Sequence, residues 1–232
     1  MYDRVKPPNL RGYYGQFAED AAIQTYFINK AWDESKTYEV KTEGFYVDIG
    51  AYSPIQMSNT YWFYQHGWRG INVEPFPEVI KKFNELRPLD RNVSCAIGTK
   101  TGSNKYYSWG NSGLNTFSEK KVEEYTRKGM VTGKPAVSDI EVIRMETLFD
   151  QYLPAGTPID FISVDVEGMD LDVLNSNNWD KYRPELVAVE LDTVNIEDLL
   201  LSDLYTFMNN KGYDLYFSLA PAIIFIDARR KK

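Results

Sequence analysis

The sequence contains almost none of the residues that build disulfides or histidine sites. Cys95 is the single cysteine among 232 residues, so no disulfide forms within the chain and we expect a cytoplasmic protein. Cys95 lies in a mostly apolar run, which predicts a small core residue. His66 is the single histidine, which excludes histidine-rich metal sites and a Ser-His-Asp triad. We expect it to lie exposed at a helix end without a catalytic role.

Long apolar runs and an excess of positive charge are also missing. No apolar stretch approaches the roughly 20 residues that cross a bilayer, and we expect no secretory signal, because the first residues lack an apolar segment of that type. With 26 Lys and Arg against 33 Asp and Glu, the formal net charge is −7. A non-specific nucleic-acid binder needs a basic face, so we expect no nucleic-acid partner, although net charge alone permits a local basic groove. The hydrophobic content of 43% fits one folded α/β domain.

The most informative stretch is GFYVDIGAY, residues 44–52. Its apolar run predicts a buried strand of a parallel sheet, which ends on Asp48 and turns at Gly50. A helical pattern follows, so the stretch predicts the first half of a nucleotide-binding βαβ unit. The second half is GINVEPFPE, residues 70–78, a strand that ends on Glu74. An acidic residue about 24 residues after the glycine suits the two hydroxyls of a ribose.

The glycine pattern that a dinucleotide needs is absent. A pyrophosphate is held by the backbone of G-x-G-x-x-G, whereas Gly50 here stands alone. Asp48 brings negative charge to the turn, which repels phosphate and suits a cationic ligand. S-adenosylmethionine (SAM) has an ammonium, a sulfonium and no phosphate, so Asp48 and Glu74 together favour SAM over NAD. The simpler alternative is that Asp48 caps a helix and Glu74 is a surface charge.

A second acidic stretch, IDFISVDVEG at residues 159–168, predicts a central strand that delivers Asp165 and Glu167 at its end. The run LVAVEL repeats this arrangement, with Glu190 at the strand end and Asp192 just beyond. Two carboxylates where a strand opens onto a cleft are costly unless something binds there. These acids therefore mark a second part of the predicted site.

The remaining pattern alternates strands and helices and ends in a hairpin. Residues 99–145 interrupt the alternation and predict an insertion, either a lid or substrate loop or a plain surface excursion. The pattern predicts an N-terminal helical extension over residues 1–43 and a main domain over residues 44–232. Other expected elements are a helical stripe over 13–32, a strand over 92–98, a helix over 196–211 and a hairpin over 213–226.

Seven stretches, spread over nearly the whole chain, carry a resemblance to a known family. They are QFAED (16–20), GFYVDIGA (44–51), SNTYWFY (58–64), GWRGINVEP (67–75), LNTFS (114–118), IDFISVDVEG (159–168) and WDKYRPELVAVE (179–190). With them the chain resembles the FkbM family of SAM-dependent methyltransferases. It departs from close relatives at Tyr52 and Ser53, where they often carry histidines.

The resemblance implies a Rossmann-like class I methyltransferase fold. In that fold a mostly parallel seven-stranded sheet has one antiparallel strand and helices on both faces, and the insertion here falls between strands 3 and 4. The implied activity is O-methyl transfer to a small-molecule or glycan acceptor, frequently a sugar hydroxyl in polysaccharide, glycolipid or natural-product pathways. The residues assigned to SAM are Gln16, Asp48, Gly50, Ala51, Asn59, Glu74, Pro75, Ala96, Ile97, Asp165 and Val166.

Within this set, Asp48 is expected near the methionine ammonium, Glu74 at the ribose, and Ala96 with Ile97 at the adenine. Methyl transfer also needs the acceptor hydroxyl held in line and its proton removed. The candidate bases are the acids at the strand ends, Asp165, Glu167 and Glu190, with Asp192 as a further alternative.

A metal ion is a further hypothesis for the same acids. Asp165, Glu190 and Asp192 are oxygen ligands that could hold Mg²⁺ and orient a diol. The favoured interpretation is simpler, with these acids hydrogen-bonded to helix termini and cofactor.

Two other functions remain open at this point. An NAD-dependent sugar dehydrogenase would need a richer glycine loop and usually a Tyr-x-x-x-Lys pair, which is absent after the fourth strand. A catalytically inactive nucleotide-binding module would bind the same cofactor without turnover. The aromatic content of 15% leaves room for a homo-oligomer interface.

Overall fold

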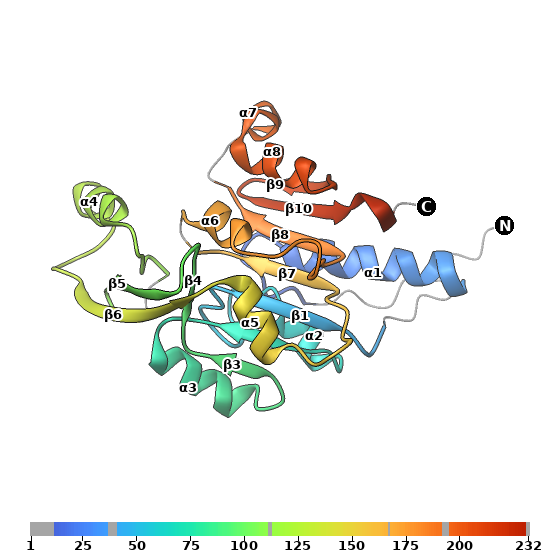
Figure 1. Cartoon of the computed structure of the whole chain (residues 1–232), viewed down its shortest axis with the longest axis horizontal. Coiled ribbons are helices and arrows are strands. Elements are labelled where there is room, and N and C mark those ends of the chain that lie inside the picture. Colours follow the sequence, from blue (N-terminus) through green and yellow to red (C-terminus); the bar gives the residue numbers. More distant parts are fainter. Residues whose placement is uncertain (1–11, 37–40, 111–112, 167, 192–194, 231–232) are drawn as a thin grey trace.

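A seven-stranded sheet forms the centre of the fold (Figure 1). The computed structural model describes residues 12–36, 41–110, 113–166, 168–191 and 195–230. In sheet order the strands are β3 (Arg91–Val93), β2 (Arg69–Val73), β1 (Phe45–Ile49), β7 (Phe161–Val164), β8 (Leu186–Glu190), β10 (Ala222–Asp227) and β9 (Tyr213–Leu219). Only β10 runs antiparallel to its neighbours in this sheet, whereas β3, β2, β1, β7 and β8 pair in parallel. This sheet is the one predicted, including the closing hairpin.

Helices cover both faces because alternate strand residues point to opposite sides of the sheet. On one face, Tyr46 and Phe161 pack with side chains of α1 (Glu19–Ser35) and α2 (Tyr61–Gln65). On the other, Val47 and Ile162 pack with α5 (Met145–Tyr152), α6 (Asp170–Asn175), α7 (Ile196–Leu201) and α8 (Asp203–Asn210). The prediction of an α/β fold with a helical layer on each side is confirmed.

The helix expected over 196–211 is divided at Ser202. Its backbone is extended at this point, with φ −73° and ψ 154°, and its hydroxyl accepts a hydrogen bond from the Tyr205 N–H at 3.1 Å. A side chain that satisfies the free N–H groups of a second helix starts that helix. The prediction of a single helix here is therefore wrong.

The strand expected over 92–98 is also divided. Its first part is β3 of the main sheet, and its second is β4 (Ala96–Ile97) in a separate three-stranded sheet of order β4-β6-β5. This sheet is completed by β6 (Ala136–Ile143) and β5 (Gly102–Ser108), which pair antiparallel. The backbone of Val142 and Ile143 supplies the partners of β4, so β4 leaves the main sheet.

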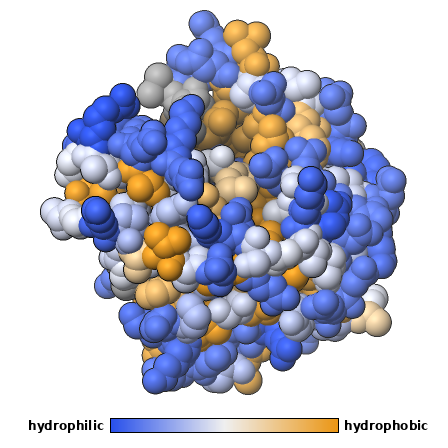
Figure 2. All heavy atoms as spheres, turned by 60° about the vertical axis from the view of Figure 1, so that its left-hand side comes forward, coloured by the Kyte–Doolittle hydropathy of each residue, from blue (hydrophilic) through white to orange (hydrophobic). Residues whose placement is uncertain are grey.

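The segment between β4 and α5 projects from the main sheet as an arm that carries α4 (Glu119–Arg127) (Figure 1). It corresponds to the insertion predicted near residues 99–145. Figure 2 turns this side of the molecule forward and shows hydrophobic atoms inside a recess on a largely hydrophilic face.

Several helix boundaries follow local chemistry. α3 (Pro77–Leu86) begins with Pro77 at its first position, where the missing N–H of proline costs no helical hydrogen bond. α1 begins at Glu19, later than the expected stripe, because Ala18 adopts a left-handed φ of 61°. A 3-10 turn, η1 (Ala228–Arg230), follows β10. Among the residues that the structure describes, every helix is too short or too polar to cross a bilayer.

Candidate cofactor and active site

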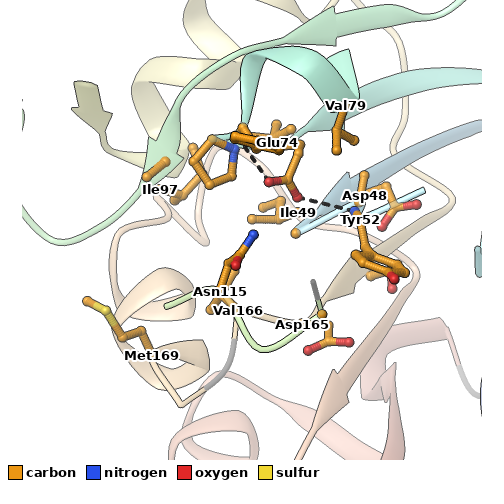
Figure 3. A pocket seen from close by; sticks show the side chains of 18 of the residues that line it. Asp48, Ile49, Tyr52, Glu74, Val79, Ile97, Asn115, Asp165, Val166 and Met169 are labelled. Atoms are coloured by element: carbon orange, nitrogen blue, oxygen red, sulfur yellow. Dashed lines mark hydrogen bonds between the residues drawn. The ribbon is translucent and has the colours of Figure 1, made fainter. Parts of the chain in front are cut away.

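A cavity of about 270 Å³ lies at the carboxyl ends of β1, β2 and β7 (Figure 3). Parallel strands bring their carboxyl ends to one edge of a sheet, so side chains that follow different strands meet there. The residues assigned to the cofactor from the sequence all line this cavity: Gln16, Asp48, Gly50, Ala51, Asn59, Glu74, Pro75, Ala96, Ile97, Asp165 and Val166. Their part in binding stays a prediction.

Gly50 is required by the neighbouring strand. Its φ is +82°, and a Cβ at this position would lie 1.8 Å from the carbonyl oxygen of Asp165. The N–H groups of Gly50 and Ala51 both donate to the Val73 carbonyl, at 3.0 and 3.1 Å. The turn after β1 is thus held by β2 on one side and touches the end of β7 on the other.

Asp48 is buried at the end of β1, with 5% of its surface exposed. Its Oδ2 accepts a hydrogen bond from the Thr60 hydroxyl at 2.7 Å. Burial raises the pKa of Asp48, while the Thr60 hydrogen bond and the charge of Arg87 oppose that rise. Asp48 therefore contacts the side chain of the residue just before α2.

Glu74 is buried at the end of β2, with 7% of its surface exposed, so the interpretation as a surface charge is wrong. Its two carboxylate oxygens accept hydrogen bonds from the N–H groups of Tyr52 and Phe76, at 3.2 and 3.1 Å (Figure 3). Burial raises the pKa of Glu74 to about 7, and the charge of Asp48 adds to the rise. Tyr52 takes a φ of 43°, a left-handed conformation that turns its N–H to this carboxylate.

One part of the cavity wall is apolar. Val79 of α3 and Ile97 of β4 line it, together with Ala96 and Cys95. Cys95 is buried as predicted, and burial raises the pKa of its thiol to about 12, so the thiol stays neutral. The sequence reasoning placed Cys95 in the core but missed that it also faces the cavity. A flat aromatic group fits such an apolar wall.

The insertion contributes several lining residues that sequence reasoning did not single out. Tyr106 of β5 packs against Phe117 with ring centroids 4.7 Å apart, and both line the cavity with Leu114 and Asn115. Burial and the charge of Glu74 raise the pKa of Tyr106. The insertion is therefore part of the site wall, and the interruption of the strand and helix alternation over residues 99–145 was the signal for it.

Asn59, which precedes α2, and Glu19, the first residue of α1, line another side of the cavity. Asn59 donates from Nδ2 to the Ser163 hydroxyl at 3.1 Å, and its Oδ1 is buried with no hydrogen-bond partner among the described residues. Glu19 also lines the cavity and accepts a hydrogen bond from the Phe17 N–H at 2.9 Å. Burial raises the pKa of Glu19, with Asp20 and Glu190 adding to the rise. Sequence reasoning did not place Glu19 in the site.

The candidate catalytic acids divide between lining and surrounding positions. Asp165 lines the cavity on the side opposite Glu74 in Figure 3. Glu190 ends β8 outside the lining, and its charge adds to the raised pKa of Asp170, which burial raises to about 6. Glu167 and Asp192 lie outside the described residues.

The structure also bears on two other predicted features, the Mg²⁺ site and the place of His66. The described part of the chain contains no group of three or more His, Cys, Asp or Glu residues that could hold a metal ion, so Mg²⁺ gains no support from it. His66 follows α2 with its side chain exposed and stacks on Trp62, as predicted for a helix end. It does not line the cavity.

A comparison with protein families decides the class of this site. The model of the methyltransferase FkbM domain matches residues 48–215, well over half of the chain. The chain belongs to the FkbM methyltransferase family. The prediction of a SAM-dependent methyltransferase is confirmed at the level of that family, and the dehydrogenase alternative is dropped. The matched range contains the Asp48, Glu74 and Asp165 strand ends.

The solved structures that resemble this FkbM methyltransferase share little sequence with it. A TehB-like SAM-dependent methyltransferase from Corynebacterium glutamicum is 10% identical, with a TM-score of 0.41, over 91% of this chain and 88% of that one. A precorrin-6y C5,15-methyltransferase from Geobacter metallireducens is 11% identical, with a TM-score of 0.41, over 89% and 85%. The N-terminal domain of human METTL16, in complex with SAH, is 13% identical, with a TM-score of 0.39, over 88% and 70%. No curated protein matches the sequence significantly.

Proposed function

We propose that this FkbM methyltransferase transfers a methyl group from SAM to a hydroxyl group, in particular a sugar hydroxyl of a polysaccharide, glycolipid or natural-product precursor. The observation that carries the proposal is the pair Asp48 and Glu74. Two buried carboxylates end adjacent parallel strands and line one cavity, in which the single glycine turn offers no cradle for a pyrophosphate.

The lining residues fit the chemical groups of SAM. Asp48 suits the methionine ammonium, because a buried carboxylate gains most from a cationic partner. Glu74 would accept hydrogen bonds from the ribose hydroxyls, and Ala96 with Ile97 would contact the adenine. The partnerless Oδ1 of Asn59 offers one more acceptor at the wall. When bound, SAM supplies a methyl group that its sulfonium has already activated.

The chain itself must align the acceptor hydroxyl and take its proton. Asp165 is the first candidate base, because it directly follows β7 and lines the cavity, whereas Glu190 does not line it. Glu190 and Glu167 are the alternatives, and Glu190 lies close enough to Glu19 to raise its pKa. A carboxylate suits this task because the proton moves only as the new carbon–oxygen bond forms.

The acceptor is proposed as a small molecule or glycan that enters beside the insertion. Leu114 and Asn115 line the cavity, and Gly113 lies beside the ring of Tyr52. Aromatic and amide side chains are suited to the faces and hydroxyls of a sugar. A homo-oligomer and a cytoplasmic location are part of the same proposal.

Two experiments test the proposal in sequence. Calorimetry with S-adenosylhomocysteine, with NAD as the control ligand, tests the cofactor; we expect the first to bind and NAD not to bind. Labelled SAM is then offered with a panel of nucleotide sugars and lipid-linked glycans. Binding of NAD alone contradicts the proposal, and cofactor binding without transfer to any hydroxyl favours the inactive module.

A further inference from the structure

Arg87 is a cation buried inside the main domain. It directly follows α3, and its side chain is 0% exposed. Its Nη2 lies 2.8 Å from Oδ2 of Asp90, which is equally buried. Nη2 also donates to the Tyr46 hydroxyl at 2.7 Å, and Nη1 donates to Ser58 and Thr60 at 3.3 and 3.0 Å. A buried guanidinium is tolerated because these acceptors satisfy its donors.

Thr60 connects this cation to Asp48. The Thr60 hydroxyl oxygen lies 3.0 Å from Arg87 Nη1 and 2.7 Å from Asp48 Oδ2. A guanidinium only donates and a carboxylate only accepts, so the hydroxyl must accept from Arg87 and donate to Asp48. Both hydrogen bonds therefore run from Arg87 through Thr60 to Asp48, and they are stronger when Asp48 is ionised.

The surroundings of Asp48 make this connection important. Burial disfavours its charged form, and the carboxylate of Asp90 acts in the same direction. Glu74, at the end of the adjacent strand, is a third acid whose charge interacts with Asp48. Arg87 and the Thr60 hydroxyl are the groups that favour the charged form. Without them, a buried carboxylate beside two other acids would take up a proton more readily.

We propose that Thr60 is a positioning residue that relays the charge of Arg87 to Asp48, and so keeps this carboxylate ionised and oriented for a cationic part of the cofactor. The inference rests on the proposed function and goes beyond it, because neither Thr60 nor Arg87 lines the cavity. A purely structural role for Thr60 would change stability and leave cofactor affinity and its pH dependence unchanged.

The test uses three substitutions in the full chain. Thr60→Val removes the connecting hydroxyl at nearly constant volume, and Thr60→Ser keeps it. Tyr46→Phe is the matched control, because the Tyr46 hydroxyl bridges Arg87 and Asp90, at 2.7 Å from each, away from the Thr60 connection. Each protein is titrated calorimetrically with S-adenosylhomocysteine between about pH 6 and pH 9, and its thermal unfolding is recorded without ligand.

We expect Thr60→Val to weaken binding about tenfold at neutral pH, the loss of one charge-assisted hydrogen bond. The loss should grow as the pH falls, because Asp48 then becomes protonated at a higher pH than in the wild type. Glu74 titrates in every variant, so the difference from wild type isolates Asp48. Thr60→Ser should bind as the wild type does, and Tyr46→Phe should unfold at a lower temperature with its affinity retained.

The inference is overturned if folded Thr60→Val binds S-adenosylhomocysteine with wild-type affinity and wild-type pH dependence. It is also overturned if Tyr46→Phe loses as much affinity as Thr60→Val. If Thr60→Val does not fold, Thr60→Ala removes the same hydroxyl together with the γ-methyl group of threonine, and the same outcomes apply. Absence of binding by the wild type would instead contradict the proposed function, so the two failures are distinguishable.

Discussion

The carbonyl oxygen of Asp165 occupies the space that a side chain on Gly50 would need, 1.8 Å from an ideal Cβ. Gly50 also has a φ of +82°, which side chains disfavour. The turn after β1 and the end of β7 therefore approach each other as backbone against backbone. This contact places Asp165 beside the turn that follows Asp48.

Gly50→Ala should destabilise the fold by about 4 kcal/mol or more, because a backbone atom blocks the new Cβ and φ is unfavourable. Urea denaturation measures the change. Gly102→Ala is the control, because nothing lies within 4 Å of its Cβ position, and it should stay near wild-type stability. Equal stability of both variants would contradict the close approach.

Glu74 should make stability depend on pH. Its pKa of about 7 in the folded chain exceeds the ordinary value of 4.5, so the folded state holds the proton longer. This contribution to stability is present below about pH 4.5 and is lost as the pH rises through 7, on the order of 3 kcal/mol in total. Glu74→Gln should remove that part of the profile. Denaturant unfolding at several pH values measures the free energy of unfolding of both proteins. If it varies with pH in the same way in the wild type and in Glu74→Gln, the raised pKa of Glu74 is excluded as the cause.

Asp90→Asn should be strongly destabilising, by about 3 kcal/mol or more, because it leaves the Arg87 cation buried without its carboxylate. Glu124→Gln is the control, since it removes an exposed ion pair with Lys128, just after α4, and should change stability little. Chemical denaturation compares the two. A small effect at Asp90 would mean that the remaining acceptors suffice for Arg87.

Asp165→Asn should lower kcat about a hundredfold or more if its carboxylate is the base, a larger effect than any loss of S-adenosylhomocysteine affinity. Glu190→Gln should have the smaller effect, because Glu190 does not line the cavity. Single-turnover rates and calorimetry separate the chemical step from binding. The reverse ranking would transfer the proposed role to Glu190.

Activity should survive rigorous chelation. The described residues hold no group of three or more potential metal ligands, and the acids near the cavity accept protein hydrogen bonds or interact with one another. Assays with and without EDTA, followed by Mg²⁺ addition, make the comparison. Loss of activity that Mg²⁺ restores would revive the metal hypothesis.

Local sequence predicted the strand ends of the site well. Asp48 and Glu74 were placed together because the carboxyl ends of adjacent parallel strands meet at one edge. The division of residues 92–98 was not predicted, since it depends on β6, more than 40 residues later, for backbone partners. The break at Ser202 was missed because a serine inside a helical pattern becomes a cap only when its hydroxyl meets the next helix.

By itself, the sequence determined the alternation of strands and helices, the single glycine turn and the acids that end the strands, because these depend on neighbours a few residues apart. Only the tertiary structure decided that Glu19 and Tyr106 reach the same cavity, and that Arg87 is connected to Asp48 through Thr60. Those contacts join segments far apart in the chain. They depend on how the layers pack, and no local periodicity records that packing.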